Sequence, residues 1–254
     1  MTTRLDLRIS AQPDGSTCGP TCLQAVYGYW GESVELAQVV AEVPQLEDGG
    51  TLAVLLACHA LRRGYRARIH TYNLQLFDPS WFGAEAPVDL RAKLLAQKKV
   101  KPKRKLQFAT DAYLDFLELG GELRMADLGE ELLREHLEAG RPIVTGLSAS
   151  WLYRCAREVG PEGHDDVRGL SVGHFVILCG YQADERRVLV ADPLCPNPFS
   201  EAQIYTVDVD RLITAILLGI LTYDANLLVI TPPGPRRGSP PRSADVHPDR
   251  RQQP

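Results

Sequence analysis

Apolar and polar residues follow two different periods in the first seventy residues of the chain. Residues 5–9 and 65–72 alternate with a period of two, which predicts short strands. Between them the apolar residues recur every three to four positions, which predicts three helices. The first runs from Cys18 to Trp30, the second follows a capping Ser33, and the third follows a capping Thr51.

The pattern changes twice in the remainder of the chain. Residues 75–140 return to the helical period, and we interpret them as a helical insertion, with His136 on a polar helix face. From residue 142 onward strands dominate, and the runs 174–180 and 186–192 are apolar at almost every position. Runs of that kind are typical of strands in the middle of a sheet.

Two segments have biased compositions. Residues 232–254 hold seven prolines and five arginines, so we predict one domain over residues 1–231 followed by a disordered tail. Residues 97–105 are strongly basic, and we interpret them as a solvated loop between helices. The alternative for this loop is a contact with an acidic substrate or a nucleic acid.

Composition and charge narrow the class of protein. A chain of 254 residues with 44% hydrophobic residues can bury a full core. Its formal net charge of −4 and pI near 5.9 argue against a dedicated nucleic-acid binder. The first ten residues lack an apolar signal segment, and the longest apolar run, 212–221, is too short to insert into a membrane. We therefore expect a cytoplasmic protein.

The six cysteines fit this compartment. Without a signal segment they are expected to be reduced thiols rather than a disulfide framework. Cys18 and Cys22 are four residues apart and no His-x₃-His pair accompanies them, which is a poor match to a zinc site. We expect no metal and no other cofactor.

Cys18 stands where a loop rich in Gly and Pro enters the first predicted helix. Unsatisfied N–H groups and the positive end of the helix dipole stabilise a thiolate at such a position. Cys18 is therefore a candidate nucleophile. Gln12, six residues upstream, can donate to an oxyanion if the loop folds back; its other interpretation is a solvated loop residue.

His174 and Asp192 are the candidate base and orienting group. If the two apolar strands form a hairpin about Ala183, His174 lies directly opposite Asp192, at hydrogen-bond reach. A slip of one residue would place Ala191 or Pro193 there instead. The alternative interpretation of Asp192-Pro193 is a turn that ends the strand.

Three segments together resemble the cysteine peptidases that process bacteriocins after a double-glycine leader, within the papain-like clan. They are Gln12-x₅-Cys18-Gly-Pro-Thr-Cys-Leu, Gly173-His174-Phe-Val-Ile and Ala191-Asp192-Pro193. The resemblance implies an α+β fold, in which a helical part packs against an antiparallel sheet with the site between them. It implies that Cys18 is the nucleophile, His174 the base and acid, Asp192 the orienter and Gln12 the oxyanion donor.

The expected activity is hydrolysis of a peptide or amide bond through a thioester, with a peptide substrate that includes leader-bearing peptides. Well-known relatives are fused to a membrane exporter and an ATPase, for which this chain has no room, so we expect a stand-alone relative. Two alternatives stay open: an acyl or γ-glutamyl-type transferase with the same triad, and a non-catalytic peptide-binding module.

Overall fold

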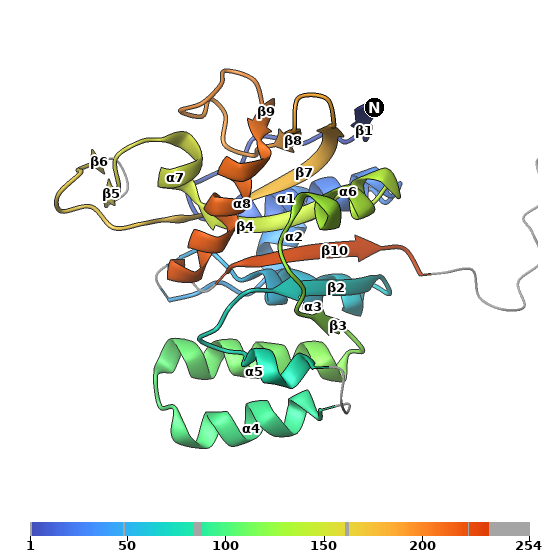
Figure 1. Ribbon diagram of the computed structural model, residues 1–254, viewed down its shortest axis with the longest axis vertical. Helices are drawn as coiled ribbons and strands as arrows, with labels where there is room; N and C mark the ends of the chain where they lie inside the picture. Colours follow the sequence, from blue (N-terminus) through green and yellow to red (C-terminus); the bar gives the residue numbers. More distant parts are fainter. Residues whose placement is uncertain (1, 48, 84–87, 161–162, 223, 234–254) are drawn as a thin grey trace, which may run out of the picture.

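The computed structural model describes residues 2–47, 49–83, 88–160, 163–222 and 224–233 (Figure 1). The predicted tail therefore lies outside the described residues from residue 234 onward. Within the described part, eight strands form one sheet in the order β3-β2-β10-β4-β7-β8-β9, with β1 beside β7. These strands are β1 (Thr2–Arg4), β2 (Arg66–Thr71), β3 (Glu122–Arg124), β4 (Ile143–Ser148), β7 (Gly173–Gln182), β8 (Arg187–Ala191), β9 (Ile204–Asp208) and β10 (Asn226–Thr231). Two short strands, β5 (Glu158–Val159) and β6 (Gly163–His164), pair separately.

The sheet is antiparallel except where β2 runs parallel to β3. Strand β7 pairs with three other strands: β4 along residues 173–178, β1 along residues 180–182, and β8 along residues 177–182. Eight of its ten residues are buried, which confirms that the apolar run 174–180 is an interior strand. The predicted α+β class, with helices and a mostly antiparallel sheet, is confirmed.

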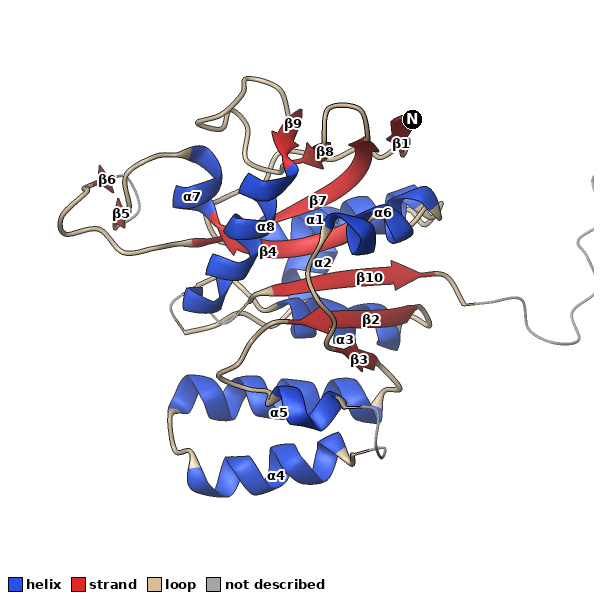
Figure 2. Cartoon of the chain, in the orientation of Figure 1, coloured by secondary structure: helices blue, strands red, loops and turns tan. Residues whose placement is uncertain are grey.

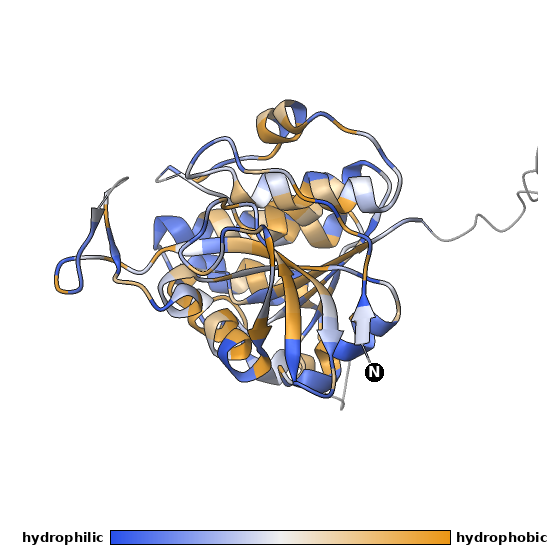
Figure 3. Cartoon of the chain, turned by 90° about the horizontal axis from the view of Figure 1, so that it is seen from above, coloured by the Kyte–Doolittle hydropathy of each residue, from blue (hydrophilic) through white to orange (hydrophobic). Residues whose placement is uncertain are grey.

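Helices cover both faces of this sheet (Figures 1 and 2). Helices α1 and α3 pack on one face, and α6 and α8 pack on the other. Viewed from above, the strands between these layers carry mainly hydrophobic residues (Figure 3). The helices are α1 (Cys18–Tyr29), α2 (Leu36–Glu42), α3 (Ala53–Arg62), α4 (Leu90–Val100), α5 (Arg104–Glu118), α6 (Glu130–Glu138), α7 (Ala149–Tyr153) and α8 (Val209–Leu218), with 3₁₀ turns η1 (Pro79–Phe82) and η2 (Gly219–Thr222).

The three helices predicted in the N-terminal third are present as α1, α2 and α3, but the predicted caps of α2 and α3 are not. Helix α2 has no side-chain cap, so Ser33 does not have the predicted role. Thr51 does not cap α3 either, because its hydroxyl donates to the Pro44 carbonyl. The backbone N–H of Ala53 instead donates to the Asp224 carboxylate, at 2.9 Å. A buried group distant in sequence thus satisfies the start of α3, which local patterns do not reveal.

The predicted strand over residues 5–9 is also absent. Strand β1 ends at Arg4, and only the Leu5 N–H continues the pairing, by donating to the Cys179 carbonyl at 2.8 Å. Leu5 and Leu7 are buried without being in a strand, so their alternation reflects burial of a loop against the sheet.

The middle of the chain is mostly helical, as predicted, with α4 and α5 forming a hairpin (Figure 1). The basic run 97–105 spans the end of α4, a three-residue connection and the start of α5, rather than one loop. Lys98 pairs with Asp111, and Arg104 pairs with Glu47. Strand β3 was not predicted. The prediction for His136 was wrong: it is buried, and its Nε2 lies 3.1 Å from Nε2 of His70.

Candidate active site

Cys18 is the first residue of α1 and is only 6% exposed. The preceding Thr17 makes no side-chain cap, so the first N–H groups of the helix keep their donor capacity. The backbone is closely packed here. A Cβ on Gly19 would lie 2.6 Å from Cγ2 of Thr51, so glycine at this position allows α1 to approach the start of α3.

His174 lies at the second position of β7, against the start of α1. Its Nε2 is 2.8 Å from Oδ1 of Asp192, and the Cys18 side chain is among the groups that raise the pKa of its imidazole. Since Nε2 faces the carboxylate, Nδ1 is the ring nitrogen left for the thiol. Burial lowers the pKa of His174, but the hydrogen bonds and charges of Asp192 and Cys18 outweigh burial and raise the pKa to about 10.

Asp192 follows the last residue of β8 and is fully buried. Its Oδ2 accepts hydrogen bonds from the hydroxyls of Tyr153, at 2.7 Å, and Tyr205, at 2.6 Å. Its Oδ1 also accepts the Leu194 N–H, at 2.9 Å. Burial raises the pKa of this carboxyl, but the hydrogen bonds from His174, Tyr205 and Tyr153 have the larger combined effect and lower it. Asp192 is thus held as an oriented anion.

Sequence reasoning missed Tyr153 and Tyr205. Tyr153 ends α7, and Tyr205 lies on β9. Their hydroxyls come from elements 39 and 13 residues away from Asp192 in the chain. The available signal was weak: each tyrosine follows a single apolar residue, Leu152 or Ile204, and a buried tyrosine hydroxyl needs a polar partner.

The predicted contact between His174 and Asp192 is present, but the predicted register was wrong. Ile177 pairs with Ala191 and Leu178 pairs with Val190, so an extended ladder would put Val176, not His174, opposite Asp192. A bulge between Leu178 and Gly180 changes the register along the hairpin. Asp192 still shares a face with His174, two residues along the strand, and reaches it diagonally.

Gln12 lies beside the segment that follows Asp192. Its backbone N–H donates to the Pro193 carbonyl at 2.8 Å, which places the loop before α1 beside Asp192. Its side-chain Nε2 donates to the Asp14 carbonyl at 2.7 Å, leaving one amide hydrogen of that group for another acceptor. The role of oxyanion donor stays a prediction.

Cys22, one turn after Cys18, has a different environment. Its thiol donates to the Phe175 carbonyl, at 3.4 Å between the sulfur and oxygen atoms. Burial, with the charges of Cys18 and Asp192, raises its pKa well above the ordinary value. All six cysteines are free thiols. In the described ranges, no cluster of three or more His, Cys, Asp or Glu residues could hold a metal ion.

None of the helices in the described ranges has the length and apolar character needed to cross a bilayer. No family model matches the sequence, and no curated protein matches it.

Solved structures with a similar arrangement are cysteine peptidases. A C39-like peptidase from Bacillus anthracis has a TM-score of 0.49 and 14% identity, over 91% of this chain and 98% of that one. The peptidase domain of Streptococcus ComA, a bifunctional ABC transporter, has a TM-score of 0.42 and 12% identity, over 89% and 99%. A double-glycine motif protease from an AMS/PCAT transporter, solved with its leader peptide, has a TM-score of 0.43 and 13% identity, over 91% and 94%. Each of these alignments covers about nine tenths of this chain.

Proposed function

We propose that this protein is a cysteine peptidase that cleaves a peptide or amide bond through a thioester on Cys18. One observation carries the proposal: Nε2 of His174 lies 2.8 Å from the Asp192 carboxylate, and the interactions of the imidazole with Asp192 and Cys18 raise its pKa. A nucleophile, a base and a group that orients the base are the elements of a catalytic triad.

In the proposed reaction His174 takes the thiol proton at Nδ1 before the Cys18 sulfur attacks the substrate carbonyl. The raised pKa of His174 keeps that proton on the imidazole at neutral pH. The proton is then delivered to the leaving amine as the C–N bond breaks and the thioester remains. Water, deprotonated by His174, attacks the thioester and releases the acid.

Two donors are assigned to the tetrahedral intermediate, whose carbonyl oxygen carries negative charge. The Cys18 N–H at the start of α1 is one, and the remaining amide hydrogen of Gln12 is the other. Donors of this kind stabilise the charge that develops in the transition state. Asp192 fixes the imidazole and balances its charge, and its two tyrosine donors keep it ionised.

The proposed partner is a peptide in an aqueous compartment such as the cytoplasm, and peptides with a double-glycine leader are among the substrates to test. The purified protein is incubated with a mixed peptide library that includes such leaders, and products are identified by mass spectrometry. We expect new carboxyl termini with the wild type and none with Cys18→Ala. Products found only as amides, and only when an amine is added, would identify a transferase instead. Absence of any product, with no alkylation of Cys18 ahead of Cys22 at neutral pH, would contradict both.

A further inference from the structure

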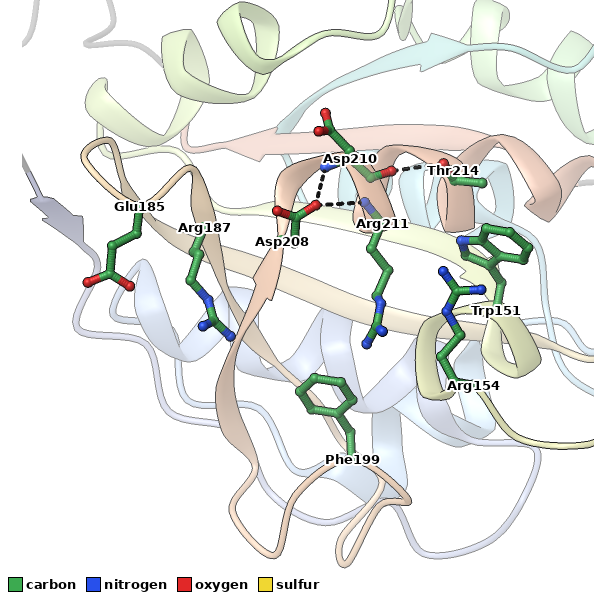
Figure 4. Close-up of a pocket in the computed structure, with 9 residues that line it drawn as sticks. All are labelled: Trp151, Arg154, Glu185, Arg187, Phe199, Asp208, Asp210, Arg211 and Thr214. Atoms are coloured by element: carbon green, nitrogen blue, oxygen red, sulfur yellow. Dashed lines mark hydrogen bonds between the residues drawn. The ribbon is translucent and has the colours of Figure 1, made fainter.

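A large hollow lies between α7, the first turn of α8, the adjoining ends of β8 and β9, and the loop that carries Phe199 (Figure 4). It encloses about 680 Å³, within the range of roughly 300–1,000 Å³ typical of small-molecule sites. None of the four candidate active-site residues lines it. The peptidase proposal therefore leaves this hollow without a role.

Three guanidinium groups line the hollow without a carboxylate partner. Arg154 lies over the Trp151 ring and Arg211 over the Phe199 ring, with 4.1 Å and 5.6 Å between guanidinium carbon and ring centroid. Arg187 donates only to the Thr206 carbonyl. Among the described residues, no ion pair involves any of the three arginines.

The carboxylates at the rim form no ion pair with these three arginines in the described part of the chain. Asp210 pairs with Arg186, and Oδ1 of Asp208 caps α8 by accepting two backbone N–H groups. Glu185 is exposed in the turn before β8. The walls are also short of acceptors, because Nε1 of Trp151 and Nε of Arg187 are buried without a hydrogen-bond partner in the described structure. Buried donors normally have one.

These features define the chemistry of a ligand. Guanidinium groups bind phosphate through parallel hydrogen bonds, and a phosphate group carries about two negative charges at neutral pH. In Figure 4 the guanidinium groups of Arg187 and Arg211 point toward Phe199, and that of Arg154 lies beside Trp151. Arg154 and Arg211 lie over the rings of Trp151 and Phe199, and an aromatic ring also offers a surface on which a planar ring can stack.

The acidic residues favour a larger ligand over a bare phosphate ion. Glu185 and the second carboxylate oxygen of Asp208 would repel an isolated anion, but they can accept hydrogen bonds from sugar hydroxyls. We propose that this hollow binds a phosphate-bearing small molecule with a planar ring, which is the chemistry of a nucleotide.

The proposal is tested by calorimetric titration of the whole protein with ADP, adenosine and inorganic phosphate, in magnesium-free buffer. We expect ADP to bind, with adenosine and phosphate each at least about tenfold weaker, because neither makes both sets of contacts. ADP binding should also weaken as ionic strength rises. The measurement needs no turnover, so its result is independent of the peptidase proposal.

Substitutions locate the binding. Arg211→Gln and Arg187→Gln should each weaken ADP binding about tenfold or more, and Phe199→Leu should weaken ADP more than phosphate. The matched control is Arg66→Gln, an exposed arginine on β2 outside the hollow, which should change nothing. No ADP binding at millimolar concentration, or equal loss in Arg66→Gln, would overturn the proposal. Equal affinity for ADP and adenosine would overturn the phosphate contact, and equal affinity for ADP and phosphate would overturn the ring contact.

Discussion

The molecule contains two buried histidines that each face a carboxylate through Nε2. His174 lies 2.8 Å from Asp192 and is 7% exposed; His59 on α3 lies 2.9 Å from Glu42 and is 6% exposed. The two pairs differ at the other ring nitrogen. In the proposed site that of His174 serves the Cys18 thiol, which is among the groups that raise the pKa of the imidazole, whereas Nδ1 of His59 is 2.7 Å from the Tyr27 hydroxyl.

The carboxylates differ as well. Asp192 is fully buried and bonded by two tyrosines, whereas the Glu42 side chain is 44% exposed. Tyr27 cannot serve as a nucleophile near neutral pH, because burial raises its pKa further above an already high value. A histidine–carboxylate pair is therefore no mark of catalysis by itself. What distinguishes the first pair is a thiol within reach and a carboxylate shielded from water.

The largest effect expected from this comparison concerns the two cysteines of α1. Cys18→Ala should lower turnover by at least about 10⁴-fold, since removal of a triad nucleophile eliminates covalent catalysis. Cys22→Ala should keep most of the activity, because that thiol bonds only a backbone carbonyl. Both are measured as kcat on a peptide identified in the library, with circular dichroism as the check on folding. Equal losses in the two variants would show that Cys18 is not the nucleophile.

The two histidines should separate activity from stability. His174→Ala should lose nearly as much turnover as Cys18→Ala. His59→Ala should keep the turnover of the folded protein but lower the free energy of unfolding, because the buried Tyr27 hydroxyl is left unpaired, at a cost of about 1–3 kcal/mol. Urea unfolding gives the free energy of unfolding, and kcat divided by the concentration of reactive Cys18 thiol gives the turnover of the folded protein. A large loss of kcat in folded His59→Ala would remove the distinction between the pairs.

Gln12→Ala should reduce kcat by about 10²–10³-fold, the usual cost of one oxyanion donor. The control is Gln24→Ala, which removes a glutamine on α1 that bonds only the Val34 carbonyl. Similar rates in Gln12→Ala and Gln24→Ala would show that Gln12 only stabilises the loop, through its hydrogen bond to the Asp14 carbonyl.

The smallest expected effect is a displacement of the pH profile of kcat/KM. Protonated His174 is present below its pKa and is lost as the pH rises through it, so the alkaline limb should lie near the raised value, about 10. Asp192→Asn removes the charge that supports the imidazolium and should move this limb to lower pH. Glu42→Gln should leave it in place, and a shift in both variants would point to a general charge effect.

The sequence predicted the helices well because their apolar period is regular, and the inner strands because their apolar runs are continuous. The predictions failed where a group is satisfied or buried by a residue that is distant in the sequence. The caps of α2 and α3 were assigned from neighbouring residues, yet the Asp224 carboxylate satisfies α3. The face of His136 was assigned from a helical pattern, yet packing against β2 buries it beside His70.

Cys18, His174, Asp192 and Gln12 lie in recognisable motifs, and their catalytic roles stay predictions. Tyr153 and Tyr205, which donate hydrogen bonds to Asp192, lie in segments without a motif and were not predicted. The predicted register of the hairpin was also wrong. The turn shifts the pairing by an odd number of residues, and the bulge between Leu178 and Gly180 shifts it by one more, so Asp192 still lies on the predicted face.

The bulge between Leu178 and Gly180 sets the register on which the contact between His174 and Asp192 depends. Near the turn, Gly180 pairs with Leu189; carried inward unchanged, this register would place Asp192 opposite Ile177, on the face away from His174. The extra residue, Cys179, returns Asp192 to the face of His174. Pairing Cys179 into a regular ladder would preserve the apolar character of both strands and still separate base from orienter, whereas deleting Cys179 would keep the inner pairs as they are. Insertions in the turn at residues 183–186 would also leave the pair together, so the contact depends on which residues pair along the inner part of the hairpin and not on the length of its turn.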